Sequence, residues 1–269
     1  MCLILFEWNP AAPAGRRLVV AANRDEFFHR AALPLSEWTG RAQILAGTDL
    51  GAEPGPTGLP GTWMGCTLRG RFAALTNFRD PRERQTNAAS RGQLVTGFLA
   101  GDLPCAEYLL EVQARAGRHN GFNLLVGDVL AAEPQLWWYS NRANRPPLKL
   151  GPGIYGVSNA LLDTPWPKLT RGVAEFSCLL AADADLERYF ALLADARLAH
   201  DHELPNTGVP LEWERRLSAI FVSHNGYGTR SSQLLRIDAQ GRVRFAERCF
   251  DPTGTAAPRD VCFERVALN

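Results

Sequence analysis

The chain begins with MCLILFEW (Met1–Trp8), in which a cysteine follows the first methionine and opens a strand-like run, Cys2–Trp8. If the methionine is removed, Cys2 carries a thiol and a free α-amine whose ordinary pKa values lie within about one unit, so the amine can accept the thiol proton. Amine-activated nucleophiles at a chain terminus are an established form of covalent catalysis. The alternative is a small buried hydrophobe on a strand, the usual fate of a free cysteine.

Further strand-like runs follow in the first third of the chain. LVVAANRDEFF (Leu18–Phe28) contains a second strand, and Trp63–Leu68 and Phe72–Phe78 face each other across a short connection that contains Gly70. A glycine in so short a connection predicts a hairpin. The stretch Gly51–Gly61 is rich in glycine and proline, which predicts a loop and a candidate lid.

The rest of the chain switches between helical and strand periodicity. Apolar residues recur at three-to-four spacing in four segments, Ser90–Leu99, Cys105–Ala116, Lys168–Leu180 and Leu186–Ala196. Strand character returns in Phe122–Val126, Gln135–Ser140, Ile154–Ser158, Ser218–Ser223, Thr229–Ile237, Arg242–Phe250 and Val261–Val266. This order predicts one layered α+β domain with antiparallel sheets, spanning residues 1–269.

Composition excludes several function classes. The 269 residues are 46% hydrophobic, which supports a large core, and 29 basic against 28 acidic residues give a formal charge of +1. With neither sign gathered in a run, we expect no nucleic-acid partner. Six scattered cysteines without a CxxC pair, and no secretory leader, predict reduced thiols and a cytoplasmic location. The apolar start is too short for a membrane span. Oligomeric state is left open.

A serine hydrolase is a weaker interpretation of the same chain. Gly156–Ala160 reads GVSNA, close to the GxSxG nucleophile elbow, and Asp163 and His200 follow in hydrolase order. A helix must start at once after an elbow, but Pro165 and Pro167 follow within a few residues. We therefore do not favour a Ser158-centred triad.

Metal and nucleotide sites have little support. His200-Asp201-His202-Glu203 places two histidines two residues apart, and the spacing supplies no third ligand, so no metal site is predicted. The glycine-rich loop contains neither GxxxxGK[ST] nor GxGxxG after a strand.

The tetrad Asn23-Arg24-Asp25-Glu26 together with Met1-Cys2 resembles the NRDE family, also called the transport-and-Golgi-organisation (member two) family. Further blocks resemble the family in family order across nearly the whole chain: Gly61–Gly65, Ala74–Phe78, Asn120–Leu124, Tyr155–Leu161, Thr164–Leu169 and Gly226–Arg230. Each block alone is weak, but together they are highly specific.

The resemblance implies an N-terminal-nucleophile hydrolase-like fold, a four-layer αββα sandwich of two antiparallel sheets. This fold is similar to that of the cysteine acylases that cleave penicillin V and conjugated bile salts. The acylase site implies a counterpart here at Cys2, Arg24, Asp25, Asn77, Asn159 and Arg230. The acylases separate the arginine and aspartate by two residues, whereas here they are adjacent. Because adjacent strand residues point to opposite faces, we expect Asp25 rather than Arg24 beside Cys2.

The resemblance also implies a role for each residue. The Cys2 thiolate would attack an amide or thioester carbonyl, and Asp25 would hold the amine that accepts the proton. Asn77 and Asn159 would donate to the oxyanion. Arg230 would lower the pKa of the thiol or bind a substrate carboxylate. The structural alternative is turn chemistry for the asparagines and ion pairs for the arginines.

Two functions remain open. The first is a cysteine amidohydrolase or acyltransferase that acts on a small amide or thioester and needs no cofactor. The second is a non-enzymatic protein that binds or traffics haem or an acyl ligand, because family members are associated with haem mobilisation and acyl-CoA metabolism. Candidate haem ligands are His29, His119, His200, His202, His224 and the cysteines. A trafficking scaffold ranks last.

Overall fold

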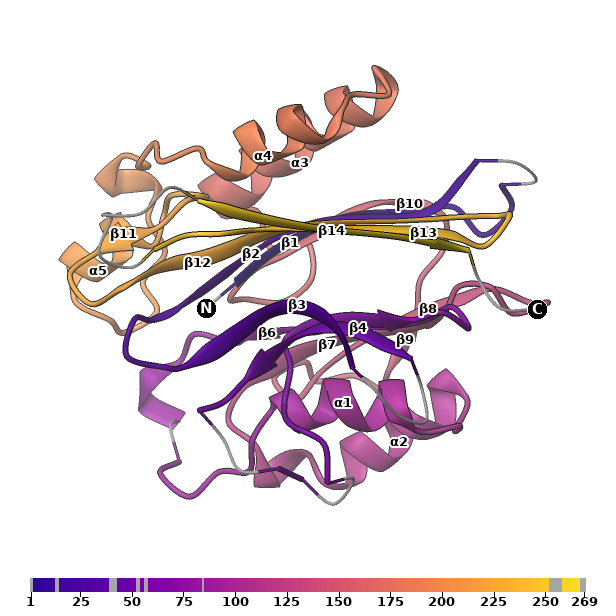
Figure 1. The fold of residues 1–269 in the computed structure, drawn as a ribbon. Coiled ribbons are helices and arrows are strands. Elements are labelled where there is room, and N and C mark those ends of the chain that lie inside the picture. The colour runs from indigo at the N-terminus through magenta and orange to yellow at the C-terminus, as the bar shows by residue number, and fades with distance from the viewer. Residues whose placement is uncertain are drawn as a thin grey trace.

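The computed structural model describes residues 2–12, 15–38, 43–51, 54–55, 58–83, 85–251 and 258–266. In this part of the chain two antiparallel sheets of seven strands each lie face to face (Figure 1). The first sheet has the order β10 (Gly153–Val157), β1 (Cys2–Trp8), β2 (Arg16–Phe27), β12 (Tyr227–Asp238), β13 (Arg242–Cys249), β14 (Arg259–Val266), with β11 (Ser223–His224) paired to β12. The second has the order β3 (Ala32–Trp38), β4 (Ile44–Asp49), β5 (Met64–Thr67), β6 (Arg71–Asn77), β7 (Phe122–Asp128), β8 (Gln135–Ser140), β9 (Leu148–Lys149).

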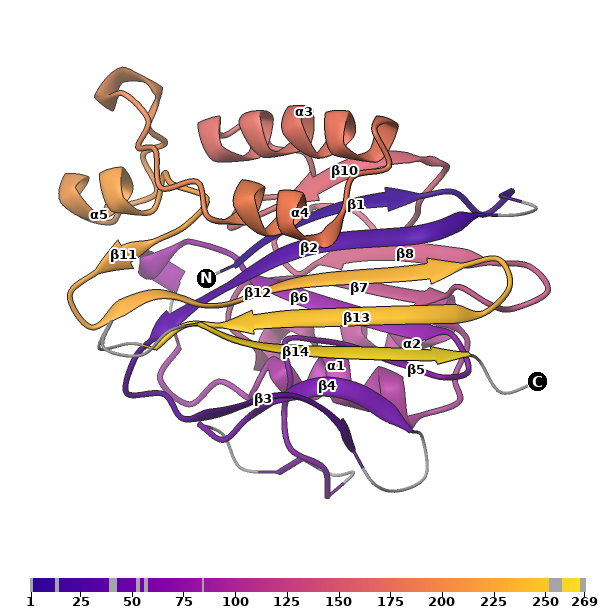
Figure 2. The same ribbon diagram turned by 45° about the horizontal axis from the view of Figure 1, so that its top comes forward.

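Helices cover the outer face of each sheet (Figures 1 and 2). The pair α1 (Gly92–Ala100) and α2 (Cys105–Ala114) packs on the second sheet, and the pair α3 (Pro167–Ala181) and α4 (Leu186–Leu193) packs on the first. A short α5 (Leu211–Arg216) lies near β11, and single 3₁₀ turns occupy Pro81–Glu83, Ala116–Arg118 and Asp201–Glu203. The predicted αββα order of layers is confirmed.

Strand alternation sorts the side chains of β1 between two cores. Ile4, Phe6 and Trp8 point into the apolar core between the sheets, whereas Leu3 and Leu5 join the core under α3 and α4. The contact with α3 is close, because a Cβ added at Gly172 would lie 3.2 Å from Leu5. Cys2 has the same phase as Ile4 and Phe6, so the strand presents it toward the second sheet.

The predicted strand Ser218–Ser223 is wrong. Most of this run lies between α5 and the two-residue strand β11. Most of its apolar side chains are buried, with Ile220 at 0% exposure, because the segment packs against the helical layer instead of extending a sheet. The carbonyl of Ile220 accepts a hydrogen bond from Asn23 of β2, at 2.9 Å. A buried segment that forms no strand ladder can therefore have the same apolar composition as a strand.

The structure also contains two strands that the sequence analysis did not predict. These are β3 and β4, in which Pro34 and Gly47 interrupt the strand-like composition. The predicted hairpin is confirmed, with Gly70 at φ +86° between β5 and β6. Part of the loop Gly51–Gly61 lies outside the described residues, and the lid interpretation stays a prediction. Among the helices of the described residues, none is long and apolar enough to cross a membrane.

Candidate functional site

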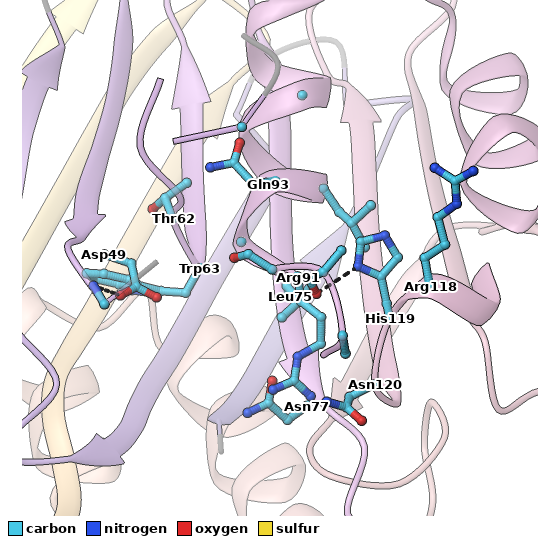
Figure 3. A pocket seen from close by; sticks show the side chains of 18 of the residues that line it. Asp49, Thr62, Trp63, Leu75, Asn77, Arg91, Gln93, Arg118, His119 and Asn120 are labelled. Carbon is cyan, nitrogen blue, oxygen red and sulfur yellow. Dashed lines mark hydrogen bonds between the residues drawn. The ribbon is translucent and has the colours of Figure 1, made fainter. Parts of the chain in front are cut away.

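A cleft of about 1200 Å³ opens where β1 begins, between the ends of the two sheets. Cys2, Arg24 and Asp25 line it from the first sheet, and Trp63 and Asn77 line it from the second. Figure 3 shows Trp63 and Asp49 on one side and His119 and Asn120 on the other. The other described lining residues lie around the end of β2, in the loop after β4, in α1 and the segment before it, and around the 3₁₀ turn Ala116–Arg118. The expected nucleophile therefore lies at a cleft large enough for a small-molecule ligand.

Cys2 is 9% exposed and is held in place by its backbone. Its carbonyl accepts a hydrogen bond from the Ser158 hydroxyl at 3.0 Å, which ties the start of β1 to the end of β10. Burial raises the pKa of the Cys2 thiol, while the nearby Arg24 acts to lower it. The thiol is therefore protonated at neutral pH and needs a proton acceptor before it can attack a carbonyl.

The register of β1 and β2 places Arg24, not Asp25, on the face of Cys2. Cys2 and Arg24 are direct cross-strand partners, and such partners point to the same side of a sheet. Asp25 points to the helical side, as Asn23 does. The expectation that Asp25 shares the face of Cys2 is thus wrong, although both Arg24 and Asp25 reach the cleft because β1 ends at Cys2 and leaves the end of β2 uncovered.

Arg24 stacks on an aromatic ring of the opposite sheet. Its guanidinium carbon lies 4.2 Å from the centre of the Trp63 ring, and the residue is 5% exposed. This cation–π contact bridges the two sheets directly beside Cys2.

Asp25 is 1% exposed and accepts a hydrogen bond from the Thr229 hydroxyl at 2.7 Å. Thr229 is its cross-strand partner on β12. Burial raises the pKa of the Asp25 carboxyl, whereas the Lys168 ammonium and the Thr229 hydrogen bond act to lower it. Asp25 is therefore a buried carboxyl whose ionised form depends on a neighbouring cation.

Lys168 is that cation, and the sequence analysis did not find it. It lies in the first turn of α3 and is 1% exposed, and its Nζ has no hydrogen-bond partner within the described residues. Burial lowers the pKa of Lys168 to about 8, against the attraction of Asp25 and Cys2. A signal exists in the sequence, because lysine occurs only at Lys149 and Lys168 in an otherwise arginine-based chain.

A buried ion pair lies in the same region. Arg79 and Glu214 form a 2.7 Å contact with both side chains 4% exposed, and Thr207 donates to the second carboxylate oxygen of Glu214. Arg79 also lies over the Trp166 ring, at 4.8 Å, next to the start of α3. The helical side of the site is therefore a network of buried charges behind Asp25.

The two predicted oxyanion donors are placed differently. Asn77 ends β6, lines the cleft and is partly exposed, and in the described part of the chain its side-chain amide has no hydrogen-bond partner. Asn159 is fully buried, and its amide donates to the Asn77 carbonyl at 2.9 Å. The side-chain carbonyl oxygen of Asn159 accepts a hydrogen bond from the Arg79 guanidinium, at 3.4 Å. Asn77 is thus available to a ligand, and Asn159 holds the backbone of Asn77.

Arg230 occupies a β-bulge. On β12, Thr229 pairs with Asp25 and Ser231 pairs with Arg24, which leaves Arg230 as the extra residue. Its guanidinium donates to the carbonyls of Phe27, Phe28 and Arg30, at 3.0–3.3 Å. Arg230 is not among the described residues that line the cleft, so it braces the turn after β2 beside Arg24.

The other two residues of the tetrad have separate contacts. Asn23 is 1% exposed and donates to the Leu193 and Ile220 carbonyls, which ties β2 to the helical layer. Glu26 lines the cleft, accepts from the Phe27 backbone amide and lies 3.9 Å from Arg30.

The geometry gives no support to a serine triad. Ser158 is 2% exposed and its hydroxyl faces the Cys2 carbonyl, while the Asp163 carboxylate accepts from the Gly156 amide at 2.8 Å. His200 is the exposed N-cap of the 3₁₀ turn Asp201–Glu203 and stacks on His202. Within the described ranges, no group of three or more His, Cys, Asp or Glu residues could hold a metal ion.

Comparisons with known proteins agree with this architecture. The sequence profile of the Transport and Golgi organisation 2 family matches residues 1–252. The Bos taurus Transport and Golgi organization protein 2 homolog is 39% identical over 94% of this chain and 95% of its own length, and the Homo sapiens homolog is 36% identical over 92% of each. The solved structure of the C2A mutant of conjugated bile acid hydrolase from Clostridium perfringens has a TM-score of 0.52 at 9% identity, covering 97% of this chain and 92% of that one. That likeness concerns the fold alone.

Proposed function

The chain belongs to the Transport and Golgi organisation 2 family, and from its N-terminal-nucleophile hydrolase-like fold and its cleft we propose that it is a cysteine amidohydrolase or acyltransferase acting on small amides or thioesters. One observation carries the proposal: Cys2 opens β1 at the cleft, and on the opposite sheet lies the side-chain amide of Asn77, which no other described residue engages. A thiol and an amide donor on facing walls are what acyl transfer to sulfur requires.

The proposed first step needs a base, since burial raises the pKa of the Cys2 thiol. Removal of Met1 frees the α-amine of Cys2, which accepts the thiol proton. The thiolate then attacks the carbonyl carbon, a carbon–sulfur bond forms, and the carbonyl electron pair moves to oxygen. The Asn77 amide donates to that oxyanion, and Asn159 keeps Asn77 in position.

In the later steps of the proposed reaction, the α-ammonium of Cys2 gives up the proton that it took from the thiol. The α-ammonium donates it to the leaving amine or thiol as the carbon–nitrogen or carbon–sulfur bond of the substrate breaks, which leaves an acyl-Cys2 thioester. Water or an acceptor amine attacks this thioester, gives up a proton to the α-amine and regenerates the thiol. Asp25 holds the amine, and the positive charge of Lys168 favours the ionised form of Asp25 against the effect of burial on its pKa.

A turnover screen tests this function. Wild-type protein and Cys2→Ala are incubated with a panel of acyl anilides and acyl thiophenol esters, and release of aniline or thiophenol is followed. The proposal expects release by the wild type and none above the uncatalysed rate by Cys2→Ala. Equal release by both proteins contradicts it.

Haem binding is a second candidate, because one histidine of the cleft has the chemistry of a metal ligand. His119 lines the cleft, and its Nδ1 lies 3.1 Å from the Ala89 carbonyl (Figure 3). Burial lowers the pKa of His119, which favours the neutral imidazole. Donation from Nδ1 to Ala89 leaves Nε2 as the ligating nitrogen. Haem titration tests this candidate, and a Soret shift that survives His119→Ala contradicts it.

A further inference from the structure

Arg24 is a buried cation that has no anionic partner among the described residues. The residue is 5% exposed and lines the cleft, yet in the described part of the chain its guanidinium has no hydrogen bond or ion pair and only the stacking contact with Trp63. A guanidinium carries five N–H donors and stays charged at any physiological pH. No nitrogen of Arg24 is among the buried side-chain atoms that lack a partner in the described residues, so these donors open into the cleft, where an anionic ligand can accept from them.

The neighbouring carboxylates of the cleft are engaged elsewhere. Asp25 points to the helical side and accepts from Thr229. Asp49 receives two guanidinium nitrogens of Arg30, at 2.9–3.0 Å, and Glu26 accepts from the Phe27 amide. Nearby Arg230 is itself a cation, bound to backbone carbonyls. Among the described residues, Arg24 therefore has a neighbouring positive charge, that of Arg230, and no counter-ion.

The Trp63 ring under Arg24 is fixed in place. Its indole N–H donates to the Gln233 side chain at 3.0 Å, and Gln233 donates to buried Glu247 at 2.7 Å. The ring also fills the space above Gly47, where an added Cβ would lie 2.3 Å from it. A tryptophan seated this firmly holds the stacked guanidinium in one plane.

We propose that Arg24 on its Trp63 platform binds an oxyanion of the substrate, a carboxylate, next to the carbonyl that Cys2 attacks. The planar guanidinium fork matches a carboxylate through two parallel hydrogen bonds. Cross-strand partners have Cβ atoms about 5 Å apart, so the carboxylate lies a few bonds from the reacting carbonyl. The substrate class is then an acyl compound with a carboxylate close to its scissile bond. This inference rests on the proposed function of Cys2.

Two alkylating reagents test the site without a known substrate. Iodoacetate carries a carboxylate and iodoacetamide does not, and the rate of each at Cys2 is measured by peptide mass spectrometry and divided by its rate with free cysteine. The normalised iodoacetate-to-iodoacetamide ratio is expected to be at least about tenfold higher in the wild type than in Arg24→Gln, the effect of one charge-assisted contact. Any change in the thiol pKa cancels in the ratio.

The controls separate this site from general charge. Arg118→Gln removes an exposed arginine that lines the same cleft and should keep the wild-type ratio. Arg24→Lys keeps the positive charge but lacks the planar guanidinium fork, so it should retain part of the iodoacetate preference. An equal ratio in the wild type and Arg24→Gln overturns the inference.

A second measurement does not depend on the reactivity of Cys2. In Cys2→Ala protein, octanoate should raise the melting temperature more than octanamide does, and the difference should disappear in Cys2→Ala/Arg24→Gln. Octanoate equal to octanamide overturns the inference even if Cys2 proves catalytic, and a larger shift with octyl phosphate than with octanoate assigns the site to phosphate and overturns the carboxylate. A carboxylate effect together with an unreactive thiol contradicts the proposed function and leaves the anion site standing.

Discussion

Cys2 and Arg24 face each other across β1 and β2, on the side of the first sheet that looks toward the second sheet. This pairing puts a permanent positive charge next to the thiol and opposes the effect of burial on the thiol pKa. The geometry of one antiparallel pair thus links the proposed nucleophile to the charge that favours its thiolate.

Replacing Arg24 by leucine should slow the reaction of Cys2 with neutral iodoacetamide. Loss of the adjacent charge raises the thiol pKa by about one unit, which lowers the thiolate fraction at pH 7 about tenfold. The pH–rate profile should shift to higher pH by the same amount. An unchanged profile would mean that Arg24 exerts no field at the sulfur.

Replacing Asn77 should mainly affect turnover, whereas replacing Asn159 should mainly affect the stability of the fold. Asn77→Ala removes an amide with no described protein partner, so turnover should fall about 10²–10³-fold with little change in unfolding free energy. Asn159→Ala leaves the Asn77 carbonyl without its donor and should cost about 1–3 kcal/mol of stability. Urea unfolding and turnover of both variants check this, and equal stability losses would contradict the division of roles.

Lys168 should make stability depend on pH in the alkaline range. Its pKa is about 8 in the folded chain and about 10.4 unfolded, so between these values the unfolded state holds more protons and stability rises with pH. Relative to Lys168→Met, the wild type should gain up to about 3 kcal/mol between pH 7 and pH 10.4. Urea midpoints across this range measure the gain. Lys149→Met, at an exposed position, should show none, and a flat difference for Lys168→Met would place its ammonium in a solvated environment.

Gly47→Ala should disturb the site from the far side of Trp63. The added Cβ would lie 2.3 Å from the ring, so the ring must move and the stacking on Arg24 weakens. We expect a loss of about 1–3 kcal/mol from overpacking and a reduced iodoacetate preference at Cys2. Gly117→Ala meets no atom within 4 Å and is the matched control. Retention of the full preference in Gly47→Ala would show that the platform is not needed.

The sequence predicted the layers well because they follow from local patterns. The strand-like run Cys2–Trp8 and the helical periodicity of later segments such as Lys168–Leu180 indicate which segments form strands and helices, and these are properties of single segments. The run Ser218–Ser223 misled because its burial comes from packing under the helical layer, which no local pattern distinguishes from a sheet.

The site was less predictable, since it depends on register and on contacts between distant segments. One extra residue in β12 turns Arg230 away from its expected place, and no signal within Gly226–Arg230 marks that bulge. The face of Arg24 follows from its pairing with Cys2, which fixes the phase of β2. Lys168 reaches Asp25 only because α3 packs on β1, although the rarity of lysine in the chain was a usable signal.

The most direct test of the account is the mass of the N-terminal peptide after brief exposure to an acyl thiophenol ester and acid quench. The account predicts a peptide that begins at Cys2 and carries one acyl group that hydroxylamine removes, and no acyl group on the same peptide of Cys2→Ala. Thiophenol released by the wild type while this peptide stays unmodified, or a peptide that still begins at Met1 in active protein, would contradict Cys2 as an amine-activated nucleophile.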